Sequence, residues 1–147
     1  MLALRALLAC EKVIFEKEHG TPSLISVLQR IIFQAAEDVP DALPKDAMAP
    51  ITWHIFTIWT HDGKEDIGKK FVQQAQLESS DGEMLPVKAT LPFTTEEDFS
   101  INSVRIIGFP VGYSKVNIKV WLESETGEVL SPESVYPIRV ERLIPTK

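Results

Sequence analysis

Apolar and polar residues alternate most regularly in the segment 116–123. Every second position there is apolar, and these residues are Val116, Ile118, Val120 and Leu122. A period of two predicts a strand with one face on the core and one face toward solvent. The segment 134–144 follows the same rule, with Tyr136, Ile138 and Val140 facing inward and Arg139 and Glu141 facing outward. The pattern therefore predicts two half-buried strands in this part of the chain.

Four further strands are predicted upstream. The segment 51–60 is rich in β-branched and aromatic residues and is apolar on both faces, which is typical of a central strand. We expect Trp53 and Trp59 to lie in the core. The segment 70–78 is a weaker strand, and 101–109 is a further strand. The segment 84–92 contains two prolines, which favour an edge position. Six to eight short strands at this spacing predict an antiparallel β-sandwich of about 7–8 strands, of immunoglobulin-like type.

The first third of the chain contains two apolar runs, 2–15 and 23–35, joined by a turn around Gly20. Both runs are apolar on both faces, so as strands they would be central and would bury Cys10 between them. The second run also fits a helix, because Thr21-Pro22 is a good helix start and apolar residues recur at helical spacing. Strand and helix both remain open for 23–35, and the β-rich remainder favours an N-terminal β-hairpin.

Outside the run 23–35, helical structure is expected only as short turns. The connector around 35–48 contains several prolines and acidic residues that stop long elements but permit a helical turn. The segment 94–98 has capping-box spacing between Thr94 and Glu97, which predicts one helical turn there.

Composition limits the possible functions. The chain has 147 residues, the size of a single domain, so one β-sandwich over 1–147 is expected. Its net charge of −6 argues against a nucleic-acid ligand, and scattered basic residues argue against a membrane surface. A single cysteine is typical of a reducing compartment, so we expect a cytoplasmic protein. Leu7-Leu8-Ala9-Cys10 looks like a lipoprotein cleavage site, but the apolar stretch before it is too short for a signal.

The two ends of the domain resemble a family of small, uncharacterised bacterial proteins. The resemblance is carried by residues 6–14 (ALLACEKVI) with a Cys-acidic pair, a glycine turn, and residues 24–28 (LISVL). A connector with several prolines follows, and then a Gly112-Tyr113 entry to the alternating strand and the strand at 136–140. The resemblance implies a β-sandwich that begins with a hairpin. It implies no activity and no functional residue.

The sequence contains no recognisable catalytic or metal-binding motif. His54 and His61 are seven residues apart on one predicted strand and so face opposite sides, while His19 lies in a distant turn. Cys10 lies within an apolar run, where thiols are inert. No nucleophile elbow, phosphate loop or dinucleotide fingerprint is present. We therefore expect no enzyme activity, no catalytic residues, no metal and no cofactor.

Trp121 is the residue that most suggests binding. By alternation it points away from the core, and Lys119, Glu123 and Arg139 share its side of the sheet. An aromatic ring among charges can anchor a protein partner or stack on a sugar, unless a loop or the second apolar run covers it. We expect a non-catalytic binding or structural component of a larger assembly, with a protein partner or self-association. The alternative is a β-sandwich that binds a carbohydrate-type ligand through outward aromatics.

Overall fold

Strands make up most of the molecule, as the alternating pattern predicts. The computed structural model describes residues 1–17, 20–34 and 43–143. Within these ranges the strands are β1 (Leu2–Phe15), β2 (Pro22–Val27), β3 (Arg30–Gln34), β4 (Met48–His61), β5 (Lys70–Ser79), β6 (Met84–Thr94), β7 (Phe99–Pro110), β8 (Lys115–Ser124) and β9 (Ser134–Leu143). A short 3-10 turn at Lys64–Asp66 joins β4 to β5.

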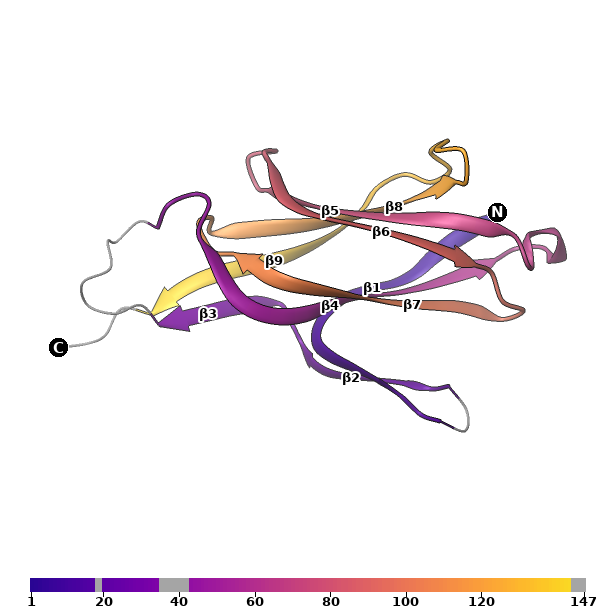
Figure 1. The fold of residues 1–147 in the computed structure, drawn as a ribbon, viewed down its shortest axis with the longest axis horizontal. Coiled ribbons are helices and arrows are strands. Elements are labelled where there is room, and N and C mark those ends of the chain that lie inside the picture. Colours follow the sequence, from indigo (N-terminus) through magenta and orange to yellow (C-terminus); the bar gives the residue numbers. More distant parts are fainter. Residues whose placement is uncertain (18–19, 35–42, 144–147) are drawn as a thin grey trace.

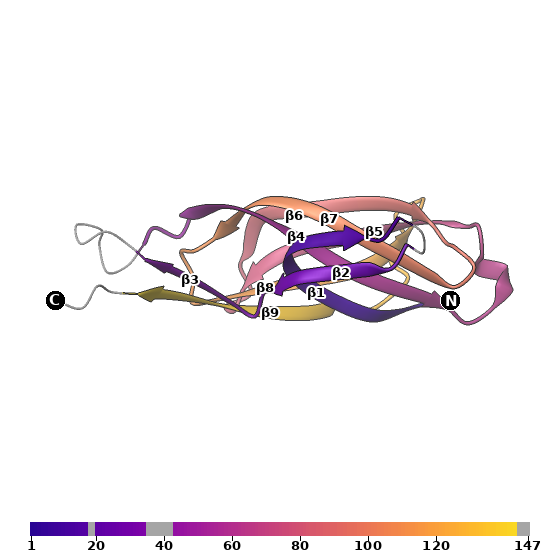
Figure 2. The same ribbon diagram turned by 90° about the horizontal axis from the view of Figure 1, so that it is seen from below.

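The strands form two stacked sheets (Figure 1). The first sheet has the order β2-β1-β4-β7, and the second has the order β3-β9-β8-β5-β6. Neighbouring strands are antiparallel except β3 and β9, which are parallel. Figure 2 shows β3 lying beside β9. The predicted β-sandwich is therefore confirmed, with nine strands in the described residues rather than seven or eight.

The core lies between the sheets and contains the residues that alternation assigned to it. All four inward residues of β8 are buried, as are Ile138 and Val140 of β9. Trp53 and Trp59 of β4 are almost completely buried, as predicted. The Trp53 ring meets the Phe109 ring edge-on at 5.3 Å, and its indole nitrogen donates a hydrogen bond of 2.9 Å to the Gly108 carbonyl. Large aromatic rings thus fill the core while their polar atoms stay paired.

A polar contact between the sheets crosses this apolar core. Gln73 of β5 points inward, and its side-chain oxygen accepts hydrogen bonds from Thr57 Oγ1 at 2.6 Å and Trp59 Nε1 at 2.8 Å. All three residues are buried. Among the described residues, the Gln73 side-chain nitrogen has no hydrogen-bond partner. The Gln73 oxygen therefore satisfies two buried donors that would otherwise lack an acceptor.

The N-terminal hairpin is confirmed, and its second run is not helical. β1 and β2 are antiparallel neighbours, with Cys10 opposite Val27 and Phe15 opposite Pro22. The run predicted at 23–35 divides between two sheets, because the chain crosses at Leu28–Gln29 and continues as β3. β1 is central and Cys10 is buried, as predicted. The prediction of a second central strand is wrong, since β2 and β3 are both edge strands.

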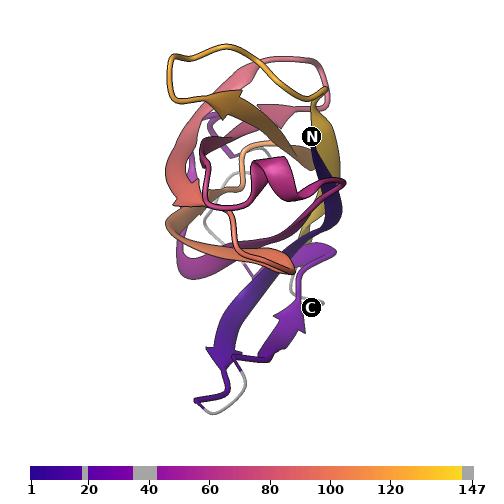
Figure 3. The same ribbon diagram turned by 90° about the vertical axis from the view of Figure 1, so that its right-hand side faces the viewer.

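The outer part of the hairpin projects from the body of the sandwich (Figure 3). β4 pairs with β1 only as far as Cys10, which lies opposite His54. Beyond Cys10, β1 has only β2 as a neighbour among the described strands. We call this two-stranded projection, residues 11–15 of β1 together with β2, the ribbon.

The two helical turns predicted near 94–98 and near 35–48 have different outcomes. No helix forms at 94–98, where Thr94 ends β6. The Thr95 hydroxyl instead donates to the Asp66 carbonyl, and the Glu96 N–H donates to the Ser100 hydroxyl. These contacts hold an irregular link between β6 and β7. The turn predicted near 35–48 falls mainly on 35–42, outside the described residues, and 43–47 contains no helix. The prediction that the segment 84–92 forms an edge strand is confirmed by β6.

Replacing Gln73 with methionine tests the contact between the sheets. The Gln73→Met side chain has similar length but no strong acceptor, so Thr57 Oγ1 and Trp59 Nε1 lose their partner in the core. We expect unfolding in urea to show a loss of about 2 kcal/mol. Gln74→Met, one residue along β5 and bonded on the outer face, is the control and should cost about 0.5–1 kcal/mol. Equal urea midpoints for Gln73→Met and the native protein would contradict the role of Gln73.

Candidate binding surfaces

The outer face of the second sheet holds the residues predicted around Trp121. β8 lies between β9 and β5, so its outward side chains are at the centre of this face. Lys119, Trp121 and Glu123 occupy alternate positions on β8 and are all half-buried. The structure therefore brings these three residues together, as alternation predicts.

Trp121 is held by a neighbouring carboxylate. Its indole nitrogen donates a hydrogen bond of 3.0 Å to Glu123 Oε1, and the Gln74 amide donates one of 3.1 Å to Glu123 Oε2. The hydrogen bond from Trp121, with that from Gln74, holds the pKa of Glu123 below its usual value. The Trp121 N–H is thus already used within the molecule.

Lys119 is also paired. Its ammonium lies 2.7 Å from Glu78 Oε2 and 3.2 Å from Glu133 Oε2. The hydrogen bond to Glu78, followed by that to Glu133, raises the pKa of Lys119. The Lys119 ammonium is therefore already paired with two carboxylates.

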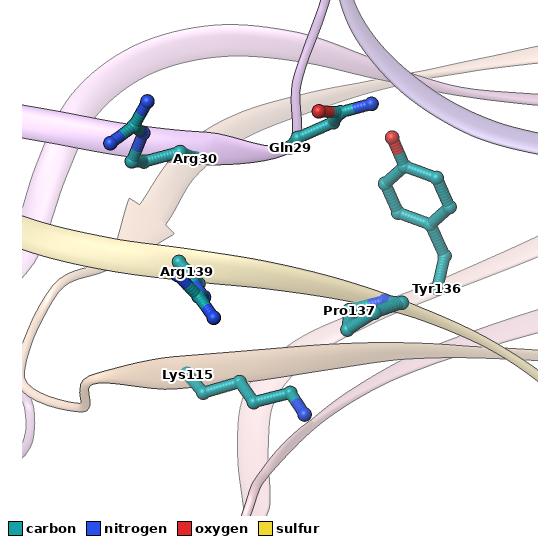
Figure 4. Close-up of a pocket in the computed structure, with 6 residues that line it drawn as sticks. All are labelled: Gln29, Arg30, Lys115, Tyr136, Pro137 and Arg139. Atoms are coloured by element: carbon teal, nitrogen blue, oxygen red, sulfur yellow. The ribbon is translucent and has the colours of Figure 1, made fainter.

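Arg139 lies apart from the Trp121 group. On β9 it lies opposite Lys115 of β8 on one side and opposite Arg30 of β3 on the other. Lys115 is four residues before Lys119. These three residues line a cleft of about 580 Å³ with Gln29, Tyr136 and Pro137 (Figure 4). The structure thus separates Arg139 from the other predicted residues and places it in a basic cleft, which the sequence pattern did not indicate.

The ribbon is a second surface that the sequence analysis missed. Four of its apolar side chains are more than 40% exposed: Ile14 (43%), Phe15 (44%), Ile25 (42%) and Val27 (43%). Ile25 and Val27 share a face with Ile14, and Phe15 lies on the opposite face with Val13 and Leu24. Both faces of the ribbon therefore expose apolar side chains. The signal was the run of apolar residues on both faces, which was interpreted as burial between two layers.

The titratable groups with metal-ligand or nucleophilic chemistry have other roles. Cys10 is fully buried, and burial raises the pKa of its thiol. His54 contacts the Glu11 carbonyl and His61 contacts the Glu97 carbonyl, while His19 lies outside the described residues. Within the described ranges, no three His, Cys, Asp or Glu residues are grouped so that they could hold a metal ion. The same ranges contain no helix with the length and apolar character that crossing a bilayer requires.

Comparison with protein-family models gives no match to this chain, and comparison with curated protein sequences gives none either. The resemblance to small bacterial β-sandwich proteins therefore stays a prediction.

The contact between Trp121 and Glu123 predicts a difference in acid stability. Because the folded-state pKa of Glu123 is lowered, its contribution to stability is present above the ordinary value near 4.5 and is lost as the pH falls through the lowered value. Glu123→Gln should therefore be less stable than the native protein at neutral pH, and the difference should disappear in acid. Urea unfolding followed by tryptophan fluorescence from pH 7 down to about pH 3 measures it.

Glu128→Gln, on the exposed turn after β8, is the matched control and should follow the native protein at every pH. A difference in the free energy of unfolding between Glu123→Gln and the native protein that stays constant across the whole pH range would contradict a role for the ionised Glu123 carboxylate.

Proposed function

We propose that the protein is a non-catalytic binding component of a protein assembly, and that its β2 edge joins a second copy of the same chain. The observation that carries this proposal is an uncharged edge strand on a projecting apolar ribbon. The absence of a catalytic motif in the sequence supports the non-catalytic role.

The four sheet edges differ in how they resist pairing with another strand. β3 carries Arg30, β7 carries Arg105, and β6 carries Lys88 between two prolines. Charged residues and prolines on an edge strand oppose edge-to-edge association. β2, with the sequence PSLISV, has no charge, and its only proline is the first residue. Of the described edges, β2 therefore has the least protection against pairing.

Self-pairing at β2 is compatible with charge. In an antiparallel arrangement about a two-fold axis, each β2 would meet the same strand of the other copy. Because residues 20–29 contain no charged side chain, this contact creates no like-charge pair even though each chain carries a net charge of −6. Two four-stranded first sheets would then become one continuous sheet.

The apolar surface of the ribbon gives such pairing a driving force. A two-stranded ribbon alone is marginally stable in water, and here both faces expose large apolar side chains. A second ribbon beside the first adds strand neighbours and removes part of that surface from water. The exposed positions are therefore the ones that a second copy would cover.

Other features fit this proposal at a coarser level. The strand order, with β3 parallel to the last described strand and the remaining pairs antiparallel, supports an immunoglobulin-like sandwich. The single thiol supports a cytoplasmic location. The carbohydrate alternative gains less support, because the Trp121 indole N–H is bonded to Glu123 and its ring is half-buried.

Ile25→Glu tests the β2 edge. Ile25 pairs with Lys12 within the ribbon, so a glutamate there gains an opposite charge in the monomer but meets like charge across the two-fold axis. We expect the native protein to dimerise in sedimentation velocity at about 100 µM, and Ile25→Glu to weaken this association by at least about ten-fold.

Ile107→Glu is the matched control, because Ile107 is an exposed isoleucine on the edge strand β7 and the charge change is the same. It should leave the association unchanged. Trp121→Ala separates the two surfaces, since loss of the dimer in that variant would assign the contact to the outer face of the second sheet. A native protein that stays monomeric, or equal weakening by Ile25→Glu and Ile107→Glu, would overturn the proposal.

A further inference from the structure

Three cationic residues form a row across three neighbouring strands of the second sheet. Arg139 of β9 lies directly opposite Lys115 of β8 and directly opposite Arg30 of β3. Directly paired residues of neighbouring strands point to the same face, with Cβ atoms about 5 Å apart. The row therefore concentrates three positive charges on one patch of a chain whose net charge is −6.

This arrangement is unfavourable for the free protein. Like charges directly opposite each other destabilise a strand pair. In the part of the chain that the structure describes, the only carboxylate paired with the row is Glu141, whose Oε2 lies 3.3 Å from Arg30 Nη1. Among the described residues, neither Arg139 nor Lys115 forms an ion pair. Three cations and one carboxylate leave a local charge of about +2, which an anion of matching charge would neutralise.

The same residues line the cleft at the start of β3. Its volume of about 580 Å³ falls within the range of small-molecule sites. In Figure 4, Arg139 and Lys115 extend from adjacent strands, while the Arg30 guanidinium points away from Arg139. The Arg30 pair with Glu141 has side chains 54% and 40% exposed, so a rotation of Arg30 toward the cleft costs little.

The remaining lining residues supply a neutral donor and an apolar wall. The exposed Gln29 amide can donate a hydrogen bond to an anion in the cleft. The Tyr136 hydroxyl is already used, since it donates a hydrogen bond of 2.8 Å to the Leu28 carbonyl. The Tyr136 ring and Pro137 therefore offer surface for an organic group rather than for the anion itself.

We propose that this cleft binds the phosphate group of a small organic phosphate monoester. A phosphate monoester carries close to two negative charges at neutral pH, which matches the local charge of the row, whereas a carboxylate carries one. The planar guanidinium of Arg139 donates two parallel hydrogen bonds to phosphate oxygens, and the Lys115 ammonium adds a point charge. The cleft is larger than a phosphate ion, so the organic part lies against Tyr136 and Pro137.

Backbone amide NMR with two probes tests the proposal. Inorganic phosphate and O-phosphoserine are titrated into the intact protein at constant ionic strength, with chloride as the balancing ion. We expect saturable shifts at the amides of Gln29, Arg30, Lys115 and Arg139, with tighter binding of O-phosphoserine than of inorganic phosphate. Arg139→Gln should weaken binding of both probes by about ten-fold or more.

Arg105→Gln makes the same charge change at an exposed arginine on β7 and should bind both probes like the native protein. Thermal unfolding in chloride shows that Arg139→Gln is folded, and its Tm should be equal to or above the native value because one like charge has left the row. Linear shifts spread over all basic residues, or equal weakening in Arg139→Gln and Arg105→Gln, would reduce the effect to general screening and overturn the proposal. Tighter binding of inorganic phosphate than of O-phosphoserine would contradict the proposed contact of an organic group with Tyr136 and Pro137.

Discussion

The crossing at Leu28–Gln29 is the constraint on which both surfaces of this molecule depend. Three hydrogen bonds fix it: the Leu28 N–H donates to Ala9, the Tyr136 hydroxyl donates to the Leu28 carbonyl, and the Arg139 N–H donates to the Gln29 carbonyl. They tie the crossing to β1 of the first sheet and to β9 of the second. Residues before the crossing are directed outward as the ribbon, and residues after it are placed beside β9. The parallel pairing that follows brings Arg30 next to Arg139.

The ribbon and the basic row are both unfavourable when no partner or ligand covers them, but the physical cause differs. The ribbon exposes apolar area, so its unfavourable free energy is hydrophobic and is not screened by salt. The basic row carries uncompensated charge, so its deficit is electrostatic and is screened by salt. By contrast, Lys119, Trp121 and Glu123 on the outer face of β8 have their polar and charged atoms paired within the molecule. For this reason the outer face of β8, although it contains the most conspicuous outward aromatic residue, offers less unsatisfied chemistry than either neighbouring surface.

The sequence was most informative where one strand had one buried face. In β8 and β9 a strict period of two identified the inward residues without any knowledge of neighbours. It was least informative in β1, where a bulge between Leu4 and Ala6 shifts the alternation. Leu2 and Leu4 consequently contact the core together with Leu7 and Ala9, although an uninterrupted strand would place the two pairs on opposite faces. A bulge depends on the partner strand, so no local pattern predicts it.

Two other features lie beyond local sequence. The run at 23–35 reads as one element because nothing in LISVLQRIIF marks the crossing, which is fixed by partners on β1 and β9. The inward position of Gln73 follows the alternation of Phe71 and Ala75, but its role requires Thr57 and Trp59 from the opposite sheet. Alternation identified Arg139 as an outward residue. Its basic neighbours, Lys115 and Arg30, follow only from the register of β9 with β8 and β3.

The hydrogen bond from Tyr136 to Leu28 joins residues 108 positions apart. Contacts of such long sequence separation form slowly, because a large loop must close before any interaction rewards it. The crossing and β3 therefore cannot reach their final pairing on the ribosome until β9 has been synthesised. During that interval the apolar residues of β1, β2 and β3 have incomplete neighbours, which makes the nascent chain vulnerable to association with other unfinished chains. The segment that organises the finished fold is thus made before the strand that fixes it in place.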